Sequence, residues 1–156
     1  ASKGIDTLIH LHNTRTELFW QTEHLKIIET HVNDQFYTSN QVKKMIEQTD
    51  KFIKASIAIT DFDQLVKQKL EKKTPPNQVL QQIGTVWSDI KKNKTDPNDF
   101  IESTETITQR LEKTMKWFGP ERVLYAGPEC GLSSFPDYQS AIECFKKINE
   151  SRQKIN

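Results

Sequence analysis

Residues 5–35 read IDTLIHLHNTRTELFWQTEHLKIIETHVNDQ, and this stretch decides the predicted fold. Apolar side chains recur along it every seven residues, at Leu11, Leu18, Leu25 and Val32. Seven residues are close to two helical turns, so these side chains would share one stripe of a helix. The stretch therefore predicts one long amphipathic helix over residues 5–35.

Further helices are expected downstream, separated by proline and glycine. Over residues 38–73, Thr38 and Gln41 have the spacing of a capping box, and apolar residues follow at helical spacing. The β-branched run 57–60 leaves two alternatives open, one kinked helix or two shorter ones, the second capped by Thr60, and we favour a continuous or slightly broken helix to about residue 73. Pro75-Pro76, Asp96-Pro97 and Gly119-Pro120 then bound predicted helices over residues 79–90 and 102–118.

The last part of the chain carries most of the turn residues. Val123-Leu124-Tyr125-Ala126 is the one segment that we expect to form a strand; a loop rich in glycine, proline and serine follows, and a last helix starts at Asp137. The expected fold is mostly α: a helical bundle with one short C-terminal strand and a docking helix. We divide it into a helical module, residues 1–95, and a C-terminal segment, residues 96–156, which could also pack as one domain.

Composition narrows the function without assigning it. The chain has 156 residues and a formal net charge of +1, so it has no global field to attract DNA or an anionic membrane. No run approaches the roughly 20 apolar residues of a membrane-spanning helix, and we find no signal-peptide pattern. The two cysteines, Cys130 and Cys144, do not make a disulfide framework, although one disulfide stays open. We expect a cytoplasmic protein with reduced thiols.

The order of motifs in residues 96–152, about a third of the chain, is recognisable. A helix containing Ile-Glu-Ser-Thr-Glu-Thr-Ile is followed by Pro-Glu-Arg, a short apolar strand, Gly-Pro-Glu-Cys-Gly-Leu at residues 127–132, and a closing helix. This order resembles the end of the cobalamin-independent methionine synthase barrel. The resemblance implies that Cys130 is a zinc ligand, in a site where zinc activates the thiol of homocysteine to accept a methyl group from methyltetrahydrofolate.

The resemblance does not extend to the rest of that enzyme. The family's other zinc ligands include a His-x-Cys pair and a glutamate from earlier strands, whereas residues 1–95 contain no cysteine and no predicted strand. A (β/α)8 barrel also typically needs about 250 residues. We therefore expect a methionine-synthase-like segment fused to a helical module, not a complete enzyme on its own. Zinc is the one cofactor implied, and no catalytic residue is assigned.

The histidines form a second candidate site. His10, Glu17, His24 and His31 would form a row on the predicted first helix. Successive members would lie about 10 Å apart, too far for one ion whose ligand bonds are about 2 Å long. His10 and His12 would point to different faces of that helix. We interpret the row as the polar flank of a packed helix. Separately, Glu129 and Asp137 lie near Cys130 in the sequence and could be ligands beside it.

Two classes of function remain. The first is a zinc-dependent methyl-transfer segment whose site is completed elsewhere, and the second is a non-catalytic helical module that binds a protein partner or self-associates. We do not expect membrane insertion. The lysine clusters in 67–73 and 91–94 lack interleaved aromatic residues, so we do not expect nucleic-acid binding either. Whether the chain is an enzyme, and its oligomeric state, are left undecided by the sequence.

Overall fold

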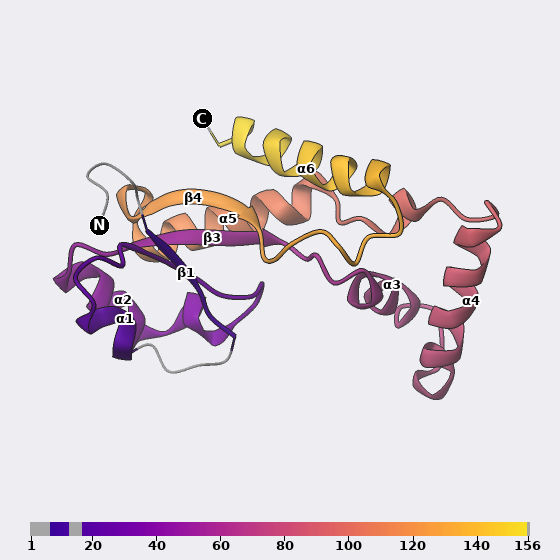
Figure 1. Cartoon of the computed structure of the whole chain (residues 1–156), viewed down its shortest axis with the longest axis horizontal. Coiled ribbons are helices and arrows are strands. Elements are labelled where there is room, and N and C mark those ends of the chain that lie inside the picture. Colours follow the sequence, from indigo (N-terminus) through magenta and orange to yellow (C-terminus); the bar gives the residue numbers. More distant parts are fainter. Residues whose placement is uncertain (1–6, 13–16, 156) are drawn as a thin grey trace.

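The structure is a computed structural model that describes residues 7–12 and 17–155 (Figure 1). These residues form an α/β fold around a four-stranded, all-parallel sheet with the strand order β1-β2-β3-β4. The strands are β1 (Leu8–His10), β2 (Ile27–Glu29), β3 (Phe52–Ala58) and β4 (Val123–Pro128). The α-helices are α1 (Glu17–Gln21), α2 (Asn40–Gln48), α3 (Phe62–Leu70), α4 (Val79–Lys91), α5 (Thr104–Phe118) and α6 (Tyr138–Gln153). The prediction of a mostly α helical bundle with one strand is therefore wrong.

The predicted helix over residues 5–35 is replaced by β1, α1 and β2, and its parts at residues 5–6 and 13–16 lie outside the described residues. Its seven-residue repeat does not make a stripe: Leu11 follows β1, Leu25 precedes β2, and Leu18 on α1 is 71% exposed. Ile27 and Ile28 are successive residues of β2 that point to opposite faces of the sheet, and both are buried. A strand of three residues is too short to show an alternating pattern, so the seven-residue spacing of apolar residues wrongly indicated a helix.

The helix expected over residues 38–73 is interrupted by β3. The break falls at the β-branched run, and the two flanking helices have their own caps. Ser39, not Thr38, caps α2 by accepting a hydrogen bond from the Val42 amide, and Asp61 caps α3 by accepting from the Gln64 amide. The alternative of two shorter helices was thus closer, but the segment between them is a strand.

The later elements agree with the sequence. Helices α4 and α5 and strand β4 lie where the pattern predicts them, and Asp137 caps α6 through the Ser140 amide. Helices α3 and α4 project from one end of the molecule (Figure 1). Strand β4 pairs with β3, so the segments before and after residue 95 share one sheet. None of the described helices is long and apolar enough to cross a membrane.

Helices cover one face of the sheet. Ile53, Ala55 and Ile57 alternate along β3, and each is 0% exposed. Ile53 packs in a cluster with residues of α1, α2 and α5, whereas Ala55 and Ile57 pack with residues of α3, α5 and α6. Lys54, which lies between Ile53 and Ala55 in β3, points to the opposite face. Lys54 on β3 and Glu29 on β2 form an ion pair there, and His10 on β1 lies beside Glu29.

Candidate metal centre at the carboxyl ends of the strands

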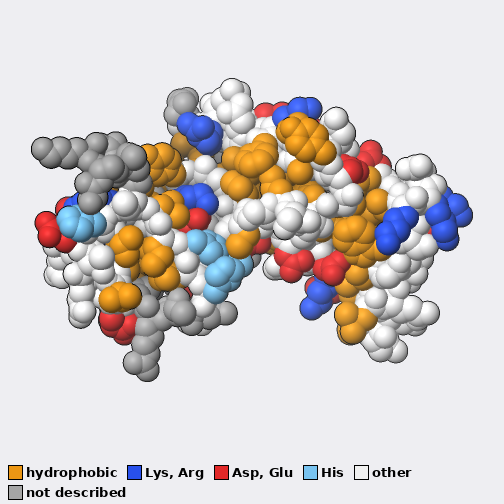
Figure 2. All heavy atoms as spheres, in the orientation of Figure 1, with side chains coloured by type: hydrophobic (Ala, Val, Ile, Leu, Met, Phe, Trp, Pro, Cys, Tyr) orange, Lys and Arg blue, Asp and Glu red, His pale blue; other side chains and the backbone are white. Residues whose placement is uncertain are grey.

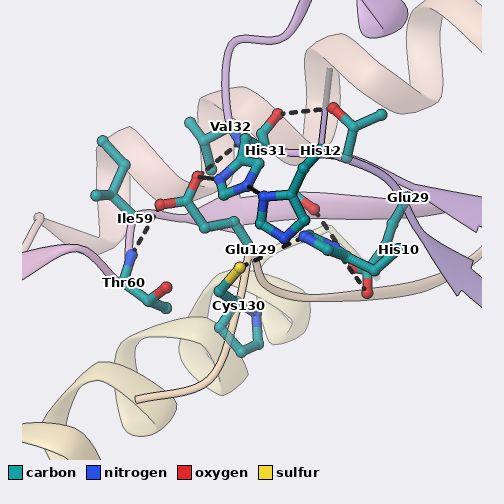
Figure 3. A network of polar contacts seen from close by, with 12 residues as sticks. His10, His12, Glu29, His31, Val32, Ile59, Thr60, Glu129 and Cys130 are labelled. Carbon is teal, nitrogen blue, oxygen red and sulfur yellow. Dashed lines mark hydrogen bonds and ion pairs between the residues drawn. The ribbon is translucent and has the colours of Figure 1, made fainter. Parts of the chain in front are cut away.

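The candidate site lies where the parallel strands end. His10 is the last residue of β1, and His12 comes two residues later. His31 and Cys130 each come two residues after their strands, β2 and β4. Successive side chains of an extended chain alternate between faces, so residues two apart point to the same side. The ends of three strands therefore bring four potential metal ligands together, as Figure 3 shows.

The four side chains are close enough to share one ion. One ligand atom from each of His10, His12, His31 and Cys130 lies within 4.8 Å of the other three. His10 Nε2 is 3.4 Å from Cys130 Sγ, and His12 Nδ1 is 2.7 Å from His31 Nε2. Ligands bound about 2.0–2.3 Å from a tetrahedral zinc ion lie roughly 3.3–3.8 Å apart. The observed separations bracket that range, so small side-chain rotations would complete a tetrahedral site.

Two of the histidines each have a buried carboxylate beside the Nδ1 atom of the ring. Glu29 Oε1 lies 3.4 Å from His10 Nδ1, and Glu129 Oε2 lies 3.5 Å from His31 Nδ1. The Glu29 contact is near enough for an ion pair, but it is not a hydrogen bond, and the buried His10 Nδ1 has no hydrogen-bond partner among the described residues. In both rings the Nδ1 atom faces a carboxylate, and Nε2 is left to face the cluster. Metal-binding histidines usually have this arrangement.

Glu129 also joins the ends of three strands. Its two carboxylate oxygens accept hydrogen bonds from the Val32 amide, at 2.8 Å, and from the Thr60 amide, at 3.0 Å. Its own amide donates to the Ala58 carbonyl at 3.0 Å. The residue is only 4% exposed. Glu129 therefore fixes the segments that follow β2, β3 and β4 relative to one another, and with them the positions of His31 and Cys130.

A lysine balances the second carboxylate. The Lys54 ammonium forms an ion pair with Glu29 and donates a hydrogen bond of 2.9 Å to the Pro128 carbonyl. Glu29 is thereby held between Lys54 and His10. Glu29 therefore supports the His10 ring and is not itself one of the four clustered ligand residues.

The electrostatics of the cluster suit a cation. Burial lowers the pKa of His10, partly offset by the nearby Glu29 carboxylate and reinforced by the other two histidines. Burial also raises the pKa of the Cys130 thiol, and the carboxylates of Glu129 and Glu29 raise it further. Without a metal, His10 therefore favours its neutral form and Cys130 its thiol form. A divalent cation would instead favour the thiolate, so that metal binding releases a proton.

The other residues singled out in the sequence lie elsewhere. His24 is exposed in the turn before β2, and Glu17 is exposed at the start of α1. Cys144 lies in the core on α6, where burial raises its pKa to about 12. Asp137 caps α6. Glu129 is not one of the four clustered ligands, but its carboxylate contacts His31 and the segments that follow β2 and β3. Of the residues considered in the sequence, Cys130, His10, His31 and His12 meet in the cluster, so the expectation that His10 and His12 point to different faces is wrong.

Sequence reasoning missed the pairing because it read residues 5–35 as a helix. His10 and His31 are on adjacent strands, whose register pairs His10 with Glu29. A usable signal was present: Leu8-Ile9-His10-Leu11-His12 and Ile27-Ile28-Glu29-Thr30-His31 both have two apolar residues, then a polar residue, then a histidine two positions on. As two short parallel strands, these segments would have predicted convergent polar side chains at their carboxyl ends.

Histidine side chains also gather near the middle of the visible face of the molecule in Figure 2, so the cluster is accessible from outside. Comparisons of this chain with protein-family models, with curated proteins and with solved structures find no match. The function is therefore argued from the geometry of His10, His12, His31 and Cys130.

Proposed function

We propose that the chain binds one zinc ion through His10, His12, His31 and Cys130, and that the bound ion activates a thiol substrate. The observation that carries this proposal is the convergence of four ligand atoms within 4.8 Å of one another. Three imidazoles and one thiolate are ligands that zinc accepts in tetrahedral geometry, whereas calcium and magnesium prefer oxygen.

The carboxylates that contact two of the histidine ligands support a preorganised metal site. A carboxylate faces the Nδ1 atom of His10 and another faces that of His31. Such a partner selects the tautomer whose Nε2 is free to bind a metal, and it makes that nitrogen more basic. Both carboxylates are buried, and each is held by other groups, so they would keep the two imidazoles in place before an ion arrives.

The resemblance of residues 96–152 to methionine synthases supports a thiol as the substrate. That family combines the cysteine of its final loop with a His-x-Cys pair and a glutamate from earlier strands. Here the corresponding features are His10-Leu11-His12 at the end of β1 and Glu29 at the end of β2, with a histidine in place of the pair's cysteine. By this reasoning the substrate is a thiol of the homocysteine type, and zinc would stabilise it as a nucleophilic thiolate.

The chain would supply the zinc and thiol part of a methyl transfer, and the whole reaction would need additional segments. Its described residues provide four parallel strands, and a closed (β/α)8 barrel has eight. The chain's own contribution would be to hold the ion, to orient His10 and His31 through Glu29 and Glu129, and to keep Cys130 at the carboxyl end of β4.

A second candidate function is a structural zinc site. The observation that favours it is the number of protein ligands: four would fill a tetrahedron, as in structural sites, whereas catalytic sites keep one position open. The ligands come from the ends of β1, β2 and β4, so the ion would join segments distant in sequence. Such a site would bind zinc and stabilise the fold without binding a thiol.

Zinc binding is tested by elemental analysis of the purified chain. We expect about one zinc per chain, and a zinc affinity that falls at least tenfold in His10→Ala and in Cys130→Ser, because each loses one ligand. His24→Ala and Cys144→Ala are the matched controls, since both positions lie outside the cluster. A wild-type chain that takes up no zinc at micromolar concentrations would exclude both candidate functions.

Thiol activation is tested with 2-mercaptoethanol and methyl iodide at pH 7. If the first candidate is correct, the zinc-loaded chain forms the methyl thioether faster than the chelated chain, and Cys130→Ser removes the difference. Mass spectrometry separates this product from methylated protein cysteine. Equal rates with and without zinc, in a chain that holds the ion, would favour the structural site.

A further inference from the structure

The three histidines of the cluster are not equivalent. His10 and His31 each have a buried carboxylate facing Nδ1, at 3.4 and 3.5 Å. In the described part of the chain, His12 contacts the other two histidines: its Nδ1 lies 2.7 Å from His31 Nε2, and its ring packs edge-on against both. His12 is also exposed, whereas the other three ligands are half-buried.

This difference sets an order of ligand strength. An imidazole backed by a carboxylate is held in one orientation and donates more strongly, and losing such a partner typically costs about 10–100-fold in metal affinity. His12 lacks this support among the described residues, and water or another ligand can reach it because it is exposed. It is therefore the weakest of the three imidazole ligands.

From this asymmetry, and resting on the zinc site proposed above, we infer that His12 is the exchangeable ligand and that a substrate thiol enters at its position. The bond between the His12 imidazole and the cation breaks, a bond between the cation and the thiol sulfur forms, and the thiol proton passes to solvent. His10, His31 and Cys130 stay bound throughout. One coordination position on the exposed side of the site thus becomes free for the thiol. A site whose four positions are filled by protein ligands at rest can therefore still bind a thiol substrate.

The alternatives within the cluster are less suited to exchange. His10 and His31 are oriented by Glu29 and Glu129, which are 6% and 4% exposed. Cys130 would carry the negative charge that partly neutralises the cation, and it lies against His10 at 3.4 Å. Displacing His10 or His31 would require moving a ring that a buried carboxylate holds in place, and displacing Cys130 would leave an extra positive charge that is costly to bury.

The test compares His12→Ala with His10→Ala and His31→Ala, with 2-mercaptoethanol as the thiol. X-ray absorption spectroscopy of the zinc-loaded wild type should show three nitrogen ligands and one sulfur ligand, changing to two of each when the thiol is added. His12→Ala should keep zinc with an affinity within about tenfold of the wild type, whereas the other two variants should lose about 10–100-fold more. His24→Ala is the control for removing an exposed histidine.

Thiol affinity gives a second, independent readout. In His12→Ala the thiol has no protein ligand to displace, so 2-mercaptoethanol should bind the zinc-loaded variant at least tenfold more tightly than it binds the wild type. Circular dichroism establishes that each variant is folded.

The outcomes separate this inference from the proposed function. A wild type without zinc overturns both. Zinc binding that is lost equally in the three histidine variants overturns the inference alone, as does a wild-type site that keeps three nitrogens at saturating thiol. Exchange at His10 or His31, seen as retained zinc and tighter thiol binding in one of those variants, would also overturn it.

Discussion

Replacing Glu129 by alanine should destabilise the chain even when no metal is present. The carboxylate accepts hydrogen bonds from the Val32 and Thr60 amides, both in buried surroundings. Alanine would leave two buried N–H donors without an acceptor, and each unsatisfied donor costs about 1–3 kcal/mol. We therefore expect a loss of about 4 kcal/mol, a large part of the roughly 5–15 kcal/mol that stabilises a typical domain.

Glutamine at the same position should keep one of the two hydrogen bonds and remove the other. The Glu129→Gln side chain keeps one acceptor oxygen, but its amide group presents N–H to the second donor. One donor then stays unsatisfied, and we expect about half the loss, roughly 2 kcal/mol. Glu112→Ala is the control, because Glu112 is exposed on α5; a surface substitution of this kind usually stays within about 0.5 kcal/mol.

The measurement is urea unfolding in the presence of EDTA, so that metal binding does not contribute. The midpoint should fall in the order wild type, glutamine, alanine, with an unchanged slope. A Glu129→Ala chain within 1 kcal/mol of the wild type would refute the reasoning, since the two amides would then have found other acceptors. With zinc present, both variants should also bind the ion about 10–100-fold more weakly, through the loss of support for His31.

Three further predictions concern the metal, a buried tyrosine and the two thiols. Zinc at a free concentration 100 times its Kd should stabilise the chain by about 2.7 kcal/mol, and EDTA should reverse this in a thermal melt. Burial raises the pKa of Tyr37, whose hydroxyl accepts from the Ser56 amide and donates to the Lys54 carbonyl. Its neutral form therefore contributes stability that is complete below pH ~10, the ordinary tyrosine pKa, and is lost as the pH rises through the folded-state value. Tyr37→Phe should cost about 1–3 kcal/mol at pH 7, and the difference from the wild type should shrink at higher pH in urea titrations. Iodoacetamide at pH 8 should label Cys130 and leave Cys144 unlabelled, because the pKa of Cys144 is about 12 and its side chain is buried. Zinc should protect Cys130, and equal labelling of both thiols, seen by peptide mass spectrometry, would contradict the fold around α6.

Part of the fold was readable from the sequence because it depends on local signals. Helices α4, α5 and α6 are bounded by prolines, glycine or a capping aspartate, and these residues act on their own neighbours whatever the rest of the chain does. Strand β4 was found because glycine and proline bracket a short apolar run. The candidate metal ligand Cys130 was also identified in this part, on the strength of its motif.

The sheet could not be predicted in the same way. Ile27 and Ile28 form a strand because they lie between β1 and β3, and β3 in turn pairs with a strand some seventy residues further along. In a parallel sheet, apolar residues point to both faces, so short strands lose the alternation that identifies them. The seven-residue leucine spacing then suggested a helix, although Leu18 is exposed and its supposed neighbours lie in separate elements.

The sequence by itself determined the chemistry available to this protein: one cysteine in a Gly-Pro-Glu-Cys-Gly-Leu loop, and histidines with the donor atoms that zinc prefers. Only the tertiary structure decided that His10, His12 and His31 meet Cys130. The physical reason is the parallel sheet, which aligns the carboxyl ends of strands far apart in the chain and points every second side chain to one side. Ligands more than a hundred residues apart in sequence thereby come within reach of a single ion.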